Sequence, residues 1–298
     1  MKKILIIYGG NSLEHDISIK SYNTIINCID NTKYIIDSIY ISKDNIWYHN
    51  DKEIINIIEF IKLYDLVFPL MHGKYGEDGS IQGMLDMFNI KYIGNSLGTS
   101  YLCMNKLRTK EILTGYNIPV LDSNYTMYPL IIKPTNGGSS IGINIVHNDI
   151  ELDNSIKEVL KYDNSYIKEK YLENPKEYEC NCLIKNNEPI IMIGEIIHNN
   201  TFYDYKTKYE NDYICTNLNP IIDDNIKNKL IYYTKKIINI FNIKDLARVD
   251  FLCKEGNIYL NEINTMPGFT DISMFPSIYT NINLTIKDIL NILITNNI

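Results

Sequence analysis

The hydrophobic positions of the first third of the chain fall in short blocks separated by longer mixed segments. The blocks are typical of buried strands and the segments between them of helices. Strands that alternate with helices in this way predict a parallel α/β sheet. The predicted elements are strands at Lys3–Tyr8, Tyr34–Ser42 and Asp65–Met71, and helices at Ile17–Asp30, Glu53–Leu63 and Ser80–Phe88.

The rest of the chain carries fewer helical segments and more strands. We therefore expect α/β structure that becomes α+β in the C-terminal half. The predicted elements are helical segments at Ser96–Gly115, Asp224–Ile240 and Ile286–Leu293, strands at Pro129–Pro134, Ser165–Lys168 and Glu177–Ile184, and a hairpin at Arg248–Asn264.

The hairpin concentrates polar side chains on one face. Val249, Phe251 and Cys253 alternate with Arg248, Asp250 and Leu252, as in a half-buried strand. A turn centred on Gly256 places Asp250 opposite Glu262 and, by the same count, Arg248 opposite Asn264. Side chains two residues apart share a face.

These oxygen donors suit a magnesium ion. Mg²⁺ is usually held by one or two carboxylates together with substrate phosphates, so we predict a metal site at Asp250, Glu262 and Asn264. The alternative is a surface hairpin with ordinary polar residues. Pro267-Gly268 directly after the strand favours a shaped functional loop.

Two glycine-rich loops follow predicted strands of the first third, at residues 9–12 and 72–79. In open α/β sheets ligands bind at the carboxyl ends of strands, so both loops are candidate sites. Turns that need a positive φ explain the glycines. They do not explain the adjacent Glu14, His72, Glu77 and Asp78.

A third loop has the character of a phosphate site. The strand at Pro129–Pro134 delivers Lys133 into a Gly/Ser loop at 135–142, where backbone N–H groups and an ammonium group meet. Neither G-x-x-x-x-G-K-[ST] nor G-x-G-x-x-G occurs. A nucleotide would therefore bind without either of these loops. The alternative is a flexible turn after an edge strand.

Composition limits the remaining possibilities. The chain has 298 residues, 45% hydrophobic residues and a net charge of −7, which fits a globular protein of two or three domains and argues against nucleic acid as a partner. No segment approaches the apolar length of a membrane span. The six cysteines show no zinc or disulfide spacing and indicate buried thiols in a reducing cytoplasm.

Taken together, the motifs resemble those of the D-alanine–D-alanine ligases of the ATP-grasp superfamily. The resemblance covers nearly the whole chain in the expected order. It is carried by GGNSLEHDIS (9–18), HGKYGEDGSIQGML (72–85), NKLRTK (105–110), IKPTNGGSSIG (132–142), FYDYKTKY (202–209), and RVDF with NEINTMPGFT and SM (248–274).

This resemblance implies three domains: residues 1–94 as an N-terminal α/β domain, 95–169 as a small central domain, and 170–298 as a C-terminal domain. It implies ATP bound between the latter two with Mg²⁺, or Mn²⁺ as an alternative. It also implies D-alanine as substrate, a role in peptidoglycan precursor synthesis, and a cytoplasmic homodimer.

The resemblance assigns roles residue by residue. The nucleotide would be bound by Lys106, Lys133, Ser140, Glu169, Lys170, Glu177 and Lys208. Arg248 and the Gly268 N–H would stabilise an oxyanion. Glu14, supported by Ser139 and Tyr209, would bind the first D-alanine. His72, Ser273 and Met274 would lie at the substrates. The segment 202–209 would be a lid, which Tyr209 anchors to Ser139 and Glu14 when it closes.

The sequence departs from the family pattern in three places. The segment between Pro119 and Lys133 is short, so a helix of the central domain is expected to be missing. Asn136-Gly137 stands where an arginine–glutamate pair is common, and Asn105 replaces a frequent aspartate. None of these removes a catalytic position.

Four functions remain to be compared. A ligase that takes D-serine or D-lactate as acceptor is the nearest alternative, and Tyr209 favours D-alanine. A general carboxylate–amine ligase does not explain Glu14 or Ser273. A non-catalytic nucleotide-binding module would be expected to lose the hairpin residues, which are all present.

Overall fold

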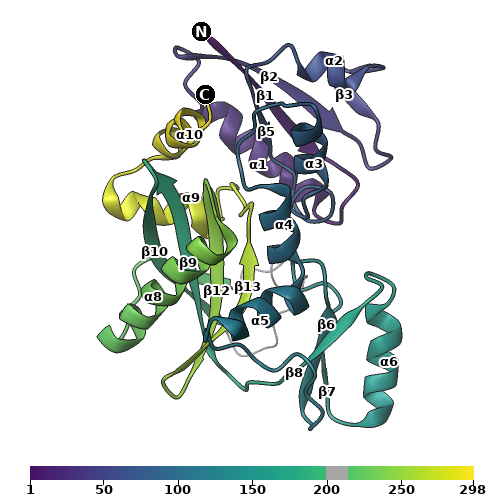
Figure 1. The fold of residues 1–298 in the computed structure, drawn as a ribbon, viewed down its shortest axis with the longest axis vertical. Coiled ribbons are helices and arrows are strands. Elements are labelled where there is room, and N and C mark those ends of the chain that lie inside the picture. Colours follow the sequence, from purple (N-terminus) through teal and green to yellow (C-terminus); the bar gives the residue numbers. More distant parts are fainter. Residues whose placement is uncertain (199–213) are drawn as a thin grey trace.

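The computed structural model describes residues 1–198 and 214–298 of the chain, whose strands form three sheets (Figure 1). In Figure 1 the first sheet lies at the top, the third below it on the left, and the small second sheet at the lower right.

The first sheet has the order β4-β3-β2-β1-β5. Strand β1 pairs in parallel with both β2 and β5, which confirms the predicted parallel arrangement. The antiparallel strands β3 and β4 extend one edge. The strands are β1 Lys2–Gly9, β2 Tyr34–Ile41, β3 Trp47–His49, β4 Lys52–Glu53 and β5 Leu66–Pro69.

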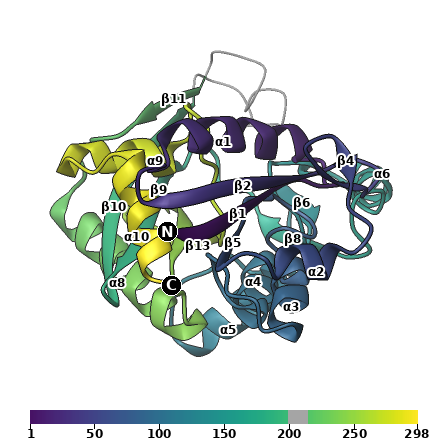
Figure 2. The same ribbon diagram turned by 90° about the horizontal axis from the view of Figure 1, so that it is seen from above.

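Three helices accompany this sheet: α1 (His15–Cys28), α2 (Ile57–Ile61) and α3 (Ser80–Met87). Figure 2 shows α1 lying along β1 and β2. The helix predicted from Glu53 was wrong at its start. Glu53 pairs with Tyr48 in the sheet, and α2 begins only after Asn56, whose side chain accepts from the Glu59 N–H.

The region 96–115 forms two helices instead of one continuous helical segment. Helix α4 spans Leu97–Met104 and α5 spans Lys106–Gly115. Asn105 between them has extended backbone, with ψ of 97°, and its side chain caps α5 by accepting from the Arg108 N–H. Helix α4 packs against the strand β13 (Asn257–Asn264) and against the helix α8 (Asp224–Phe241).

The second sheet is small and antiparallel, with the order β7-β6-β8. Its strands are β6 Leu130–Pro134, β7 Asn144–Val146 and β8 Tyr166–Lys170. Helix α6 (Asp149–Val159) covers it and was not predicted. Of its residues only Val159 is fully buried, so its apolar pattern is weak. Residues 116–129, all described, contain no helix.

The third sheet has the order β11-β10-β9-β12-β13 and is antiparallel. Its strands are β9 Lys176–Lys185, β10 Glu188–His198, β11 Ile214–Asn217, β12 Leu246–Lys254 and β13 Asn257–Asn264. The accompanying helices are α8 Asp224–Phe241, α9 Met274–Ile278, the 3₁₀ helix η1 Tyr279–Ile282 and α10 Ile286–Thr295.

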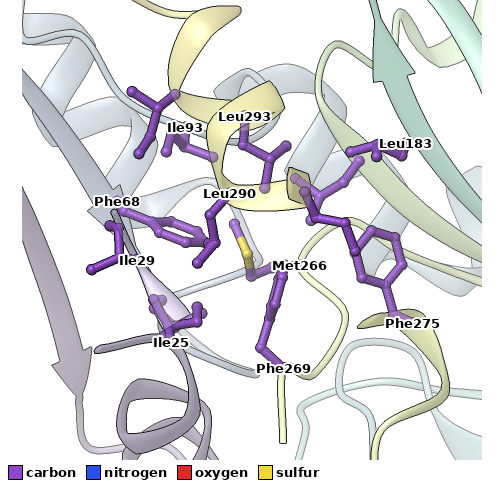
Figure 3. Close-up of a cluster of buried hydrophobic side chains, with 14 of the residues drawn as sticks. Ile25, Ile29, Phe68, Ile93, Leu183, Met266, Phe269, Phe275, Leu290 and Leu293 are labelled. Atoms are coloured by element: carbon purple, nitrogen blue, oxygen red, sulfur yellow. The ribbon is translucent and has the colours of Figure 1, made fainter. Parts of the chain in front are cut away.

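One hydrophobic core joins the first and third sheets (Figure 3). Phe68 of β5 and Ile25 of α1 lie in the same cluster as Leu290 and Leu293 of α10. Apolar burial stabilises by about 25 cal/mol per Å², so this shared core holds the two sheets in a fixed relation. The division at residues 94 and 169 stays a prediction.

No helix in the described part of the chain has the length and apolar character needed to cross a membrane.

Candidate functional site

Two cavities meet between the second and third sheets and the loops of the first. One cavity has a volume of about 140 Å³ and is lined by Lys106, Lys133, Ser140 and Glu177, among others. We call it the nucleotide-side cavity, and the other the substrate-side cavity, after the roles predicted for their lining residues. The substrate-side cavity, of about 480 Å³, is lined among others by Glu14, His72, Gly268, Ser273 and Met274. Gly138, Glu179, Ile196, Arg248 and Glu262 line both cavities.

The hairpin that separates the cavities has the predicted pairing. Arg248 lies opposite Asn264 and Asp250 opposite Glu262. This pairing depends on an irregularity that the sequence did not reveal. Lys254 pairs with Asn257 at the turn, and the register shifts between Asp250 and Phe251. The extra residue, Asn261, accepts a hydrogen bond from Lys133 Nζ at 3.1 Å.

Arg248 is the electrostatic centre of the hairpin. Its Nε and Nη2 donate to the two carboxylate oxygens of Asp250 at 2.8 and 2.7 Å, and Glu179 lies 3.4 Å away. Burial lowers the pKa of the guanidinium, but Asp250 and Glu179 outweigh it and raise the pKa well above its usual range. The arginine therefore stays charged.

The residues proposed for the metal fit a magnesium ion by their chemistry. Asp250 and Glu262 are opposite each other across the hairpin. Asn264 is fixed because its Oδ1 accepts from the Met266 N–H at 2.9 Å. In the described ranges no three His, Cys, Asp or Glu side chains form a metal-binding group. Two carboxylates and one amide oxygen, completed by phosphate, are a typical Mg²⁺ ligand set.

Three buried lysines lie at the nucleotide-side cavity: Lys106 and Lys133 line it, and Lys110 is next to them through its ion pair with Glu169. Glu169 forms ion pairs with Lys110 and with Lys133, the latter at 2.7 Å. Lys106 Nζ donates to the Gly137 carbonyl and lies 3.7 Å from Glu262. Burial lowers the pKa of Lys110 to about 8, although Glu169 opposes the shift. Buried charges of this kind need partners, and each of these lysines has one.

The Gly/Ser loop reaches across to the first sheet. Ser139 and Ser140 have φ values of 54° and 57°, in the left-handed region that L side chains rarely adopt. The Ser139 hydroxyl donates to Glu14 at the start of α1. The structure thus brings Glu14 and Ser139 together, as expected.

His72 lies directly under the substrate-side cavity and is buried. Its Nε2 contacts Ser21 Oγ at 3.0 Å and its Nδ1 contacts the Met266 carbonyl at 3.1 Å. Glu77 is 3.4 Å away. Burial lowers the pKa of His72, but Glu77 outweighs burial and the pKa is raised. Burial raises the pKa of Glu77.

The loops that follow β1 and β5 meet as the parallel pairing requires. Ser12 Oγ donates to the His72 carbonyl at 2.7 Å. Gly268 and Ser273 both line the substrate-side cavity and lie close together. A Cβ added at position 268 would be only 2.8 Å from Ser273 Oγ. Ser273 Oγ also accepts from the Thr270 N–H at 3.1 Å.

Four predicted residues are not placed in the lining of these cavities by the described part of the chain. Glu169 is buried and pairs with Lys110 and Lys133 instead. The Lys170 side chain is exposed and lines a separate cavity with His147 and Lys254. Lys208 and Tyr209 lie outside the described residues, as does the predicted lid at 202–209.

Three residues of the site were missed from the sequence. Lys110 follows Lys106 by one helical turn, so the spacing placed both on one face of α5. Glu179 follows Glu177 by two positions on β9, which also puts them on one face. Asn261 gave no signal, because only the bulge turns it towards Lys133.

Comparison with known proteins agrees with this arrangement. Residues 3–59 and 52–95 match a family model described as D-ala D-ala ligase N-terminus, and residues 101–295 match D-ala D-ala ligase C-terminus. The D-alanine–D-alanine ligase of Staphylococcus haemolyticus is 32% identical over 336 residues, which covers 98% of this chain and 94% of that protein. That of Thermoanaerobacter pseudethanolicus is 34% identical, with 93% and 91% covered.

Solved structures show the same fold. The VanG D-Ala:D-Ser ligase from Enterococcus faecalis is 30% identical, with a TM-score of 0.87 and 99% of both chains covered. The D-alanine–D-alanine ligase from Bacillus anthracis complexed with ATP is 27% identical, with a TM-score of 0.82 over 99% of this chain and 97% of that one. These similarities confirm the predicted ATP-grasp fold. The chain belongs to the D-alanine–D-alanine ligase family.

Proposed function

We propose that the protein uses ATP to join two D-alanine molecules into D-alanyl-D-alanine, for peptidoglycan precursor synthesis. The observation that carries this proposal is the meeting of the two cavities at Arg248 and Glu262. A phosphoryl group from the lysine-lined side and a carboxylate from the Glu14 side would come together there.

The reaction would proceed in two steps. The carboxylate oxygen of the first D-alanine attacks the γ-phosphorus of ATP, and the bond to ADP breaks, which gives an acyl phosphate. The neutral amine of the second D-alanine then attacks the acyl carbon, and phosphate leaves from the tetrahedral intermediate. The amine loses one proton as the peptide bond forms.

The residues of the chain would supply charge and orientation. Lys106 and Lys133 would neutralise the phosphates, with Ser140, Glu169 and Glu177 around the nucleotide. Glu14 and Ser139 would bind the ammonium of the first D-alanine, and His72, Ser273 and Met274 would surround the substrates. When bound to Asp250, Glu262 and Asn264, Mg²⁺ would neutralise charge on the transferred phosphoryl group.

Arg248 and the Gly268 N–H would stabilise the oxyanion of the tetrahedral intermediate. A guanidinium has five N–H donors, and Asp250 takes two of them. One donor of this type is typically worth about 3–4 kcal/mol in the transition state. Arg248 could thus donate to the oxyanion and raise the rate while its other donors keep the pair with Asp250.

Similarity to a D-Ala:D-Ser ligase makes D-serine the second candidate for the acceptor. The test is to measure ATP-dependent phosphate release with D-alanine, D-serine, D-lactate and L-alanine, with and without Mg²⁺, and to identify the product by mass spectrometry. Release with D-alanine alone supports the proposal. Absence of release with every substrate contradicts it.

We further propose three domains at 1–94, 95–169 and 170–298 and a cytoplasmic homodimer. The six cysteines are all free thiols, as is usual in reducing compartments. The mass of the protein in solution, from light scattering, tests the dimer.

A further inference from the structure

The Gly/Ser loop is tied to the joint between α4 and α5 by side chains that the proposed reaction does not use. Asn105 Nδ2 donates to Asn136 Oδ1 at 3.1 Å. Asn136 in turn donates to Asp163 Oδ2, from its backbone N at 2.7 Å and from its Nδ2 at 3.1 Å. We call Asn105, Asn136 and Asp163 the amide clasp.

Asn105 performs two tasks in this clasp with the two ends of one amide. Its Oδ1 accepts from the Arg108 N–H at 3.0 Å and caps α5. Its Nδ2 is thereby directed towards the loop. A serine can accept the capping hydrogen bond as well, but its side chain is shorter and lacks the amide donor.

The clasp lies next to Lys106, which is held to the same loop at both ends. Its backbone N–H donates to the Thr135 carbonyl at 2.9 Å, and its Nζ donates to the Gly137 carbonyl. The Gly137 N–H contacts Met104 Sδ at 3.4 Å. Two hydrogen bonds therefore link the loop to the first residue of α5.

The clasp is also neutral at the Asn105–Asn136 contact. The two departures from the family pattern that the sequence shows at these positions are partners in the structure, at 3.1 Å. An amide pair of this kind fixes geometry without adding charge near the lysines. Burial already lowers the pKa of Lys106.

We propose that Asn105 and Asn136 are positioning residues for the nucleotide: they hold the 135–142 loop against α5 so that Lys106 and the loop N–H groups face the phosphates together. The inference rests on the proposed function and adds which residues of this chain set the geometry of phosphate binding.

The test is a double-mutant cycle with Asn105→Ser, Asn136→Ala and the double variant. We expect each single variant to raise the KM for ATP about tenfold, as the loss of one hydrogen bond of about 1.4 kcal/mol requires, with kcat changed less than about threefold. We expect the double variant to be little worse than Asn136→Ala, because that variant by itself removes the Asn105–Asn136 contact and also the Nδ2 bond to Asp163.

Asn148→Ser is the matched control. Asn148 caps α6 by accepting from the Glu151 N–H and also donates from its amide, to Glu151 Oε1. Asn148→Ser therefore loses an amide hydrogen bond of the same kind at a helix that does not carry the 135–142 loop. We expect its KM for ATP to be unchanged. Hydrogen exchange of residues 135–142 without nucleotide should rise in the Asn105 and Asn136 variants and not in the control.

Three results would overturn the proposal. They are an unchanged KM for ATP in both single variants, multiplicative effects in the double variant, or an effect in Asn105→Asp but not in Asn105→Ser, which would indicate charge alone. If the unmodified protein releases no phosphate with any amino acid, the proposed function fails separately. The clasp is then tested by calorimetric ATP binding and by hydrogen exchange. If Asn105→Ser does not fold, Asn136→Ala still tests the proposal, because it leaves the Asn105 cap of α5 in place.

Discussion

Arg248 donates two parallel hydrogen bonds, of 2.8 and 2.7 Å, to the carboxylate of Asp250, which lies two residues further along the same strand. Successive side chains on one face of β12 thus form a bidentate pair at the point where both cavities meet. A planar fork with two aligned donors is a property of arginine that lysine lacks.

Arg248→Lys tests this geometry. The charge is kept and the fork is lost, so we expect kcat to fall by roughly 10²–10³, as for removal of one oxyanion donor. Steady-state kinetics of phosphate release measure it. Arg108→Lys on α5 is the control, since Arg108 is exposed and pairs with Glu111 at the surface. A kcat within about twofold of the unmodified enzyme would exclude Arg248 from the chemistry.

Asp250→Asn tests the metal assignment. The variant loses a carboxylate that we assign to Mg²⁺, so we expect the Mg²⁺ concentration for half-maximal rate to rise at least about tenfold, a loss of about 1.4 kcal/mol or more. Chelation with EDTA should abolish activity in the unmodified protein, and added Mg²⁺ or Mn²⁺ should restore it. Asp44→Asn, at an exposed position, should leave the metal titration unchanged. Full activity in EDTA would rule out the metal.

Lys110→Met tests the buried ion pairs. The variant leaves Glu169 with one of its two lysines, and loss of one partner of a buried pair typically costs about 3–5 kcal/mol. Urea unfolding measures the free energy. The double variant Lys110→Met/Glu169→Gln should recover part of the loss, because the buried carboxylate is also neutralised. No recovery would show that packing by Lys110, not its charge, is what matters.

The same carboxylate gives a pH dependence of stability. Burial raises the pKa of Glu169, but Lys133 and Lys110 outweigh burial and the pKa lies below its ordinary value of 4.5. The stabilisation is therefore fully present above pH 4.5 and is lost as pH falls through the lower, folded-state pKa. We expect the stability of the unmodified protein to fall more steeply below pH 4.5 than that of the double variant. Parallel curves would contradict this.

Gly194→Ala tests the acceptor side. A Cβ at this position of β10 would lie 2.1 Å from Met274 Sδ, so the Met274 side chain must move. We expect the KM for the second D-alanine to rise about tenfold, or about 1.4 kcal/mol, with the KM for ATP unchanged. Gly98→Ala is the control, because nothing lies within 4 Å of the added carbon. Equal changes in both KM values would indicate a general disturbance.

Asn297→Ala tests how the C-terminal helix is anchored. Asn297 Nδ2 donates to buried Asp245 at 2.8 Å and to the Leu293 carbonyl at 2.9 Å. Asp245 also accepts from the Gly94 N–H at 2.7 Å. A buried carboxylate that loses a donor costs about 1–3 kcal/mol, which urea unfolding resolves. Asn291→Ala, at a half-buried position of α10, should cost less than Asn297→Ala.

Local patterns were sufficient where one period dominated. The alternation from Arg248 to Asn264 predicted the hairpin, which the structure confirms. The pairs of Asp250 with Glu262 and Arg248 with Asn264 were predicted from a turn centred on Gly256, and they form because the bulge at Asn261 shifts the register. The apolar blocks predicted β1, β2 and β5 and their parallel pairing. They failed at Glu53, because a two-residue strand has no detectable period.

The sequence by itself determined the family, the fold class and the pairs that share a face within each strand of the hairpin, Arg248 with Asp250 and Glu262 with Asn264. These follow from motif order and from a period of two. Tertiary structure alone decided which distant side chains meet. Glu169 is shared by Lys110 and Lys133, Asn105 reaches Asn136, and a bulge turns Asn261 towards Lys133. These contacts join residues far apart in the chain. They are fixed by the packing of whole elements, which no local period encodes.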